Sequence, residues 1–184
     1  MAKKRGRESA RDMIFSMGAV LLTVLVILGV TYRSHNQQMP KADFSAALAT
    51  AKTAANWPIL VPTLAKSGTP EGYQLTQARF EAESYGQVGS SRWYLGYQDN
   101  HGEFVSIWQS DGSRTRVIAA ASNDGNCSKS IEVKDATWSY CQQVKPLTRT
   151  IYRDFGEYLV VISGTVSESK LVNLAESLVA VKKS

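Results

Sequence analysis

An uncharged apolar run close to the N-terminus constrains this chain more than any other feature. Residues Met13–Val30 contain no Asp, Glu, Lys or Arg over 18 positions. At a rise of about 1.5 Å per residue, this run and the two residues after it form a helix about 30 Å long, which matches the hydrocarbon core of a bilayer. We therefore expect residues 13–32 to form a single transmembrane signal-anchor helix.

The length of the run and the residues after it favour an anchor that is not cleaved. A cleaved signal peptide has an apolar region of roughly 7–15 residues followed by a small-x-small cleavage site. Here Thr-Tyr-Arg-Ser-His follows the longer run, and no Cys stands there for lipoprotein anchoring. A cleaved signal peptide and a buried helix of a soluble protein remain the alternatives.

The charges on either side of the run predict its orientation. Residues 1–12 carry five Lys or Arg and two acidic side chains, whereas only Arg33 and Lys41 lie in a comparable window after the run. Positive residues stay in the cytoplasm, so we expect a cytoplasmic basic tail over residues 1–12 and a plasma-membrane protein whose C-terminal part is extracytoplasmic.

The distribution of charge along the chain excludes a nucleic-acid partner. The chain has a net charge of +5, of which the first 12 residues supply +3. The rest contains 16 basic and 14 acidic residues, with no basic stripe among aromatic side chains. Binding by release of counterions needs such a stripe, so we expect no nucleic acid among the partners.

The two cysteines agree with an oxidising compartment. Cys127 and Cys141 both lie in the part expected outside the membrane, where a disulfide is the natural state. Closing this loop stabilises a fold by about 3 kcal/mol in the chain-entropy account. A metal or redox site is disfavoured, because no His lies nearby and the spacing is not C-x-x-C. Two buried free thiols remain the alternative.

The extracytoplasmic part begins after a polar tether. Residues 33–42 include a Pro and show no periodicity, so they indicate a linker to a domain over residues 43–184. Asp43 is a suitable N-cap for a helix over Phe44–Ala55. The segment Trp57–Pro62 is apolar but broken twice by Pro, which favours an extended cover over a sheet.

From Gly72 onward the apolar pattern has a period of two, typical of strands with one buried face. Arg92–Gln98 and the strand after it form the strongest predicted hairpin, across the turn at Asp99-Asn100-His101-Gly102. Eight strands are predicted, over Tyr73–Phe80, Arg92–Gln98, Glu103–Gln109, Thr115–Ala121, Ser130–Val133, Thr137–Gln142, Leu147–Arg153 and Tyr158–Ser163.

A second helix is predicted at the C-terminal end. Ser167 is a suitable N-cap, and the apolar residues that follow form one stripe at helical spacing. These residues are Leu171, Leu174, Ala175, Leu178 and Val179. The expected fold class is α+β: a mostly antiparallel meandering sheet with one N-terminal and one C-terminal helix packed on the same face, preceded by the transmembrane helix.

The order of several motifs resembles a known family, the actinobacterial single-pass membrane proteins of domain of unknown function 4245. The shared motifs are Arg11-Asp12-Met13 before the apolar run, Trp57–Pro62, Pro70–Arg79, Trp93–Tyr97, Gln109-Ser110 and Ile162–Thr165 before Leu171–Leu178. Tyr73 departs from the family, in which Trp is expected. The resemblance implies an anchored extracytoplasmic domain and supplies no reaction.

Catalytic groups are sparse in this sequence. The only histidines are His35, in the linker, and His101, in a hairpin turn where a solvated role is expected. Ser167-Glu168-Ser169-Lys170 matches the Ser-x-x-Lys of penicillin-recognising enzymes, but its companion elements are missing and chance accounts for it. Glu81 and Glu83 share a strand face, where solvated carboxylates are the default.

Aromatic side chains at strand spacing give one candidate ligand platform. Trp93, Tyr97, Trp108 and Trp138, together with Phe104 and Tyr140, could offer flat apolar rings to a sugar or a lipid. Packing into the core of the sheet is the alternative use of rings at this spacing.

The sequence thus predicts a non-enzymatic ligand-binding or protein-interaction module of the cell envelope, without a cofactor or metal. Its expected partners are the plasma membrane and an envelope lipid, glycan or membrane protein. An envelope hydrolase that uses carboxylates or His101 is the first alternative. A structural or assembly subunit of a membrane complex is the second.

Overall fold

A computed structural model describes residues 6–34, 42–62, 68–83 and 90–181. The chain divides into two compact units, Met1–Met39 and Pro40–Ser184. Residues 1–5 of the predicted basic tail lie outside the described residues, as does the part of the predicted linker over residues 35–41, which includes His35.

The first unit consists of the helix α1, Gly6–Ser34. It covers the whole uncharged run, and its described side chains, those of residues 13–29, are exposed. Within the described residues, no helix is found that is long and apolar enough to cross a membrane. The predicted helix is present, whereas the membrane span assigned to it in the predicted fold is not shown.

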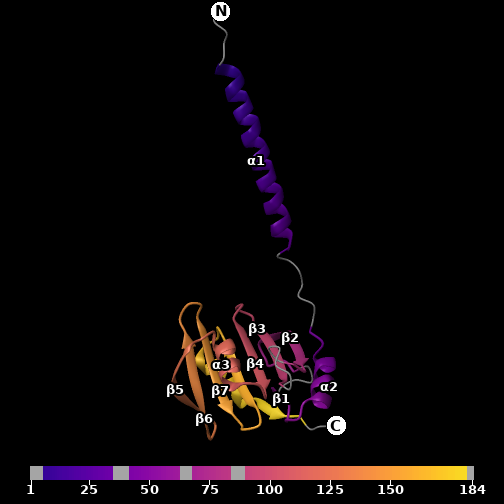
Figure 1. The fold of residues 1–184 in the computed structure, drawn as a ribbon, viewed down its shortest axis with the longest axis vertical. Helices are drawn as coiled ribbons and strands as arrows, with labels where there is room; N and C mark the ends of the chain where they lie inside the picture. Colours follow the sequence, from indigo (N-terminus) through magenta and orange to yellow (C-terminus); the bar gives the residue numbers. More distant parts are fainter. Residues whose placement is uncertain (1–5, 35–41, 63–67, 84–89, 182–184) are drawn as a thin grey trace, which may run out of the picture. The chain divides into compact units, whose positions relative to one another are not determined.

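The second unit is built on a seven-stranded antiparallel sheet with the order β2-β3-β4-β8-β7-β6-β5 (Figure 1). Its strands are β2 (Tyr73–Glu81), β3 (Arg92–Asp99), β4 (Phe104–Ser110), β5 (Asn126–Val133), β6 (Ala136–Gln143), β7 (Thr148–Asp154) and β8 (Leu159–Gly164). Seven of the eight predicted strands are therefore confirmed, including the predicted hairpin of β3 and β4.

Alternation along the strands gives the sheet two apolar faces. In β8, Val160 and Ile162 belong to the larger core, whereas Leu159 and Val161 belong to a smaller core on the opposite face. The helices α2 (Phe44–Ala54) and α4 (Glu168–Glu176) contribute to the larger core, and α3 (Arg114–Ser122) covers the smaller one. The sheet is thus covered by helices on both faces.

Local capping explains where α2 and α4 begin. The Asp43 carboxylate accepts a hydrogen bond from the Ala46 amide, and the Ser167 hydroxyl accepts one from the Lys170 amide. Both side chains satisfy amides that a helix start leaves without a partner. The two predicted helices and their predicted N-caps are confirmed.

The prediction of a strand over Thr115–Ala121 is wrong, because this segment lies within the helix α3. Val117 and Ala121 are four residues apart and both face the smaller core. Three consecutive alanines favour a helix, and Asn123 ends it in the left-handed conformation with φ of 53°. A helix on the second face also corrects the expected layout of two helices on one face.

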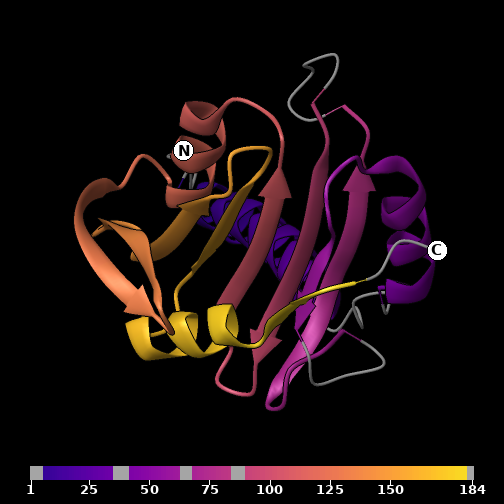
Figure 2. The same cartoon turned by 90° about the horizontal axis from the view of Figure 1, so that it is seen from below.

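The prediction that the last helix continues through Leu178 and Val179 is also wrong. The helix α4 ends at Glu176, and Leu178–Ala180 forms the strand β9. This strand pairs in antiparallel fashion with β1 (Leu60–Pro62) in a separate two-stranded sheet. Figure 2 shows α4 and β9, in yellow, crossing one face of the large sheet.

The segment before β1 is held on the sheet by a buried side chain. The Gln109 amide group accepts a hydrogen bond from the Leu60 amide at 2.7 Å and donates one to the Pro58 carbonyl at 3.2 Å. The Trp93 ring nitrogen donates to the Leu60 carbonyl. Trp57–Pro62 therefore covers the large sheet from outside it, as its prolines predict.

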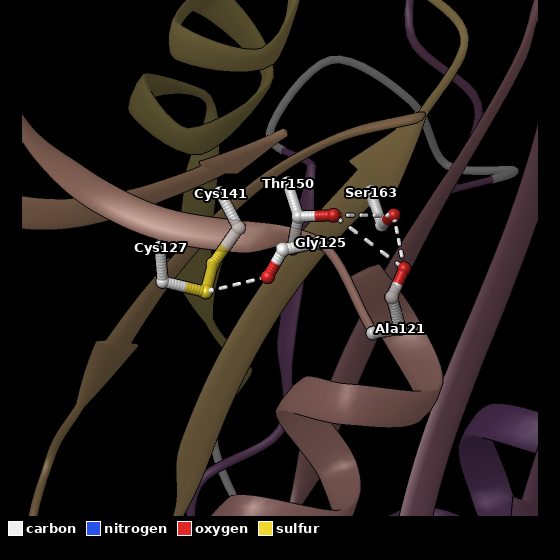
Figure 3. The surroundings of a disulfide bond; sticks show 6 residues. All are labelled: Ala121, Gly125, Cys127, Cys141, Thr150 and Ser163. Atoms are coloured by element: carbon white, nitrogen blue, oxygen red, sulfur yellow. Dashed lines mark hydrogen bonds between the residues drawn. A yellow bond between two sulfur atoms is a disulfide. The ribbon is translucent and has the colours of Figure 1, made fainter. Parts of the chain in front are cut away.

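The two cysteines lie opposite each other on the paired strands β5 and β6, with their sulfurs at disulfide distance, 1.98 Å (Figure 3). Beside them, the Thr150 and Ser163 hydroxyls lie 2.8 Å apart and the Ser163 hydroxyl donates to the Ala121 carbonyl. These bonds fasten the end of α3 to the sheet, since a helix leaves its last carbonyls without intrahelical partners.

Candidate functional site

A cavity of about 410 Å³ opens at the end of the sheet where β2 begins and β3 ends. Its volume lies within the roughly 300–1,000 Å³ of small-molecule sites. Three segments meet there: the start of β2, the turn between β3 and β4, and one side of α4. The lining residues are Pro70, Glu71, Gly72, Tyr73, Asp99, Asn100, His101, Lys170, Asn173, Leu174 and Ser177.

The turn between β3 and β4 is shaped by Asp99. Its Oδ1 atom accepts hydrogen bonds from the main-chain amides of His101 and Glu103, at 2.8 and 2.9 Å. A short acidic side chain often closes a turn in this way, by bonding to amides that follow it. The turn therefore presents Asn100 and His101 to the cavity.

The helix α4 supplies the opposite wall through its residue spacing. Lys170, Asn173, Leu174 and Ser177 follow one another at intervals that place them on one side of a helix. The buried Leu174 is shared with the larger core, so the floor of the cavity is continuous with the packed interior.

An ion cluster joins the two walls. The Lys170 ammonium lies 2.7 Å from Asp99 Oδ2 and 2.7 Å from Glu103 Oε2, and only 7% of the Asp99 side chain is exposed. The hydrogen bond from Lys170 lowers the pKa of Asp99 to about 2. The hydrogen bond to Asp99, and to a smaller extent the one to Glu103, raise the pKa of Lys170 above its usual range. Lys170 and Asp99 are therefore charged at neutral pH.

Tyr73 gives the cavity an aromatic side. Burial raises the pKa of its hydroxyl, so the phenol is neutral at physiological pH. Its ring packs edge-on against Tyr97, with the ring centres 6.4 Å apart. Tyr97 is fully buried, and its hydroxyl donates to the Gly68 carbonyl. The Tyr73 ring thus rests on a fixed support.

His101 lines this cavity, and its hydrogen bond with Asp99 runs through the main chain. None of the described residues hydrogen-bonds to the ring nitrogens. Ser167 acts as the cap of α4, and Lys170 belongs to the ion cluster. The Ser-x-x-Lys pattern thus has a structural explanation.

The four aromatic residues of the predicted platform do not share a surface. Trp93, Tyr97 and Trp138 are buried in the larger core. Trp108 lies on the other face, where its ring nitrogen donates to the Ser106 hydroxyl. Alternation along the strands separates them, and core packing occupies the rings.

The predicted carboxylate pair also lies away from the cavity. Glu81 forms ion pairs with Arg79 and Arg92, and Glu83 is exposed. The carboxylates that the fold brings together are instead Asp99 and Glu103, which share Lys170. Asp99 and Glu71 line the cavity. These carboxylates lie in turns and at strand ends. The alternating pattern that predicts strands does not single out functional residues at such positions.

Sequence reasoning missed Tyr73, Lys170 and Asn173 as site residues. One signal was available: Lys170 and Asn173 stand at helical spacing beside the apolar stripe of α4. Nothing local pairs Lys170 with Asp99, which is 71 residues away. Within the described ranges, no group of three His, Cys, Asp or Glu side chains could hold a metal ion.

A family model described as "Protein of unknown function (DUF4245)" matches residues 5–178. The chain belongs to the DUF4245 family. The predicted resemblance to this family is confirmed, and the match includes every residue that lines the cavity. No curated protein and no solved structure gives a significant match. Membership of DUF4245 attaches no activity to the chain.

Proposed function

We propose that this chain is a membrane-anchored extracytoplasmic module that binds a small envelope ligand in the cavity between β2, β3 and α4, without converting it. The observation that carries the proposal is the cavity itself. It combines a volume of about 410 Å³ with an aromatic ring, a buried leucine and convergent polar groups, the combination found in small-molecule sites.

The anchor is proposed from the sequence. The 18-residue uncharged run, continuous within a single helix, has the length of a bilayer core, and five basic residues precede it. The N-terminus is then cytoplasmic, and the chain crosses the plasma membrane of an actinobacterial cell once. A cysteine pair at disulfide distance in the second unit is in keeping with an oxidising compartment.

The charges of the ion cluster support binding rather than catalysis. A general acid or base works best when its pKa lies near the operating pH. The pKa of Asp99 is about 2, and that of Lys170 is raised, so neither group exchanges a proton readily at neutral pH. The cluster is suited to holding α4 against the turn and shaping the cavity.

The test is a mass measurement on the full-length chain. The protein is purified from its own membranes into lipid nanodiscs, and its mass is recorded under native conditions. We expect a bound small molecule on the wild type that is absent from Asn173→Trp, whose indole fills the cavity. Ser169→Trp is the matched control, since Ser169 is exposed on the same helix outside the lining. Equal occupancy in all three proteins would contradict the proposal.

An envelope hydrolase is the second candidate, because His101 lies on the cavity lining next to Asp99. Hydrolysis cleaves the ligand into two products whose masses sum to that of the ligand plus one water. The released molecule is incubated with fresh wild-type protein, and we expect its mass to stay unchanged. Two products whose masses sum to that of the ligand plus one water, and that do not form with His101→Ala, would favour the hydrolase.

A further inference from the structure

We propose that the cavity takes a neutral saccharide, with one sugar ring lying against Tyr73. The proposal rests on the function proposed above and names the chemical class of its ligand. It is argued from the charges, the hydrogen-bonding groups and the apolar surface of the lining.

The charges of the site disfavour an anionic ligand. Asp99 and Glu103 contact the Lys170 ammonium at 2.7 Å, and Glu71 adds another carboxylate to the lining. These carboxylates repel a phosphate or a carboxylate group. A neutral ligand does not meet this repulsion.

The hydrogen-bonding groups of the site match hydroxyls. Both oxygens of Asp99 already accept hydrogen bonds from protein N–H groups. The other polar groups of the lining include the amides of Asn100 and Asn173 and the hydroxyl of Tyr73. Each of these groups both donates and accepts hydrogen bonds. Sugar hydroxyls do the same, whereas an ammonium group only donates.

The apolar part of the lining matches the face of a sugar ring. Tyr73 offers an aromatic ring fixed by its contact with Tyr97, and Pro70 and Leu174 extend this surface. Aromatic side chains present a large rigid apolar area at little cost in conformational entropy. A pyranose carries C–H groups on its faces and hydroxyls around its rim, so its face suits Tyr73 and its rim suits the amides.

The ligand class is tested by calorimetry on the full-length chain in lipid nanodiscs. The probes are the methyl pyranosides of glucose, galactose and mannose, followed by the 6-amino and 6-phosphate derivatives of the one that binds best. We expect one neutral pyranoside to bind and its 6-phosphate derivative to bind at least about tenfold more weakly. Equal or tighter binding of the 6-phosphate derivative overturns the proposal, as does tighter binding of the 6-amino derivative or the failure of all three neutral sugars to bind.

Variants of two lining residues test the proposed contacts. Tyr73→Phe loses only the hydroxyl and should weaken sugar binding about threefold, whereas Tyr73→Leu also loses the ring and should weaken it at least about tenfold. Lys170→Met leaves the carboxylates unopposed, so the preference should turn toward the 6-amino derivative. Unchanged affinity in Tyr73→Leu, or an unchanged preference in Lys170→Met, overturns the assignment. Thermal unfolding confirms that each variant is folded.

The native mass measurement separates this inference from the function on which it rests. A co-purified molecule that Asn173→Trp displaces, and that contains no sugar, overturns the saccharide assignment and leaves the binding function intact. A chain that carries no molecule and binds no sugar overturns both.

Discussion

Asp99 connects three segments that are distant in the sequence. It closes the turn between β3 and β4 through two main-chain amides and holds α4 through Lys170. The turn itself could be predicted, because Asp-Asn-His-Gly is typical turn chemistry. The contact with Lys170 could not, since nothing in the sequence near either residue specifies the other. The same holds for the pairing of Gln109 with Leu60.

The lowered pKa of Asp99 gives an expected pH dependence. Its pKa is about 2 in the folded protein and about 3.9 in an unfolded chain, so the ionised carboxylate stabilises the fold above about pH 4 and this stabilisation is lost as the pH falls toward about 2. The variant Asp99→Asn lacks this stabilisation at every pH. We expect wild type to have the higher Tm at neutral pH and the difference to shrink in acid. A constant difference down to about pH 2 would contradict this explanation.

Gly164 is a position where the fold requires the absence of a side chain. It lies in β8 opposite Val105, and a Cβ there would overlap the Phe104 carbonyl oxygen. Since the obstacle is the backbone of a neighbouring strand, Gly164→Ala should cost about 1–3 kcal/mol of stability or more. Gly156→Ala is the comparison: the space there is open, and only its positive φ of 85°, which Gly164 does not share, disfavours a side chain. Chemical denaturation should show a larger loss for Gly164→Ala than for Gly156→Ala.

At the scale of elements, prediction followed the strength of local signals. The caps Asp43 and Ser167 located two helices, and alternation located seven strands. The prediction failed at α3, because the apolar residues of this short segment are compatible with both the helical and the strand period. It failed again at β9, because the pairing with β1 decides the conformation there and that partner is more than 100 residues away.

The strand β1 should depend on one buried side chain. Gln109 is fully buried and bonds to both Leu60 and Pro58. Gln109→Ala removes both hydrogen bonds, each of which contributes about 0.5–1.5 kcal/mol to stability. We expect a lower Tm and faster hydrogen exchange at the Leu60 amide. Gln74→Ala, on the exposed side of β2, should change neither. Unchanged exchange at Leu60 in Gln109→Ala would refute the role given to this residue.

At the scale of the whole molecule, composition and periodicity predicted the class of the fold, but not the order of its strands. The sheet places β8 between β4 and β7, so a strand late in the sequence lies at the centre. The cavity depends on that arrangement, because its walls come from β2, the turn after β3 and α4. A site assembled from separate segments has no single sequence motif to reveal it.

The cavity-bearing domain is proposed to lie outside the membrane, and one labelling experiment tests this location. Asn173→Cys places a thiol on the cavity lining, and intact cells are treated with a maleimide that does not cross membranes. We expect full labelling without lysis, reduced by the bound sugar. Ala2→Cys, in the basic N-terminal tail, should react only after lysis. Labelling of Asn173→Cys only in lysed cells would contradict the account.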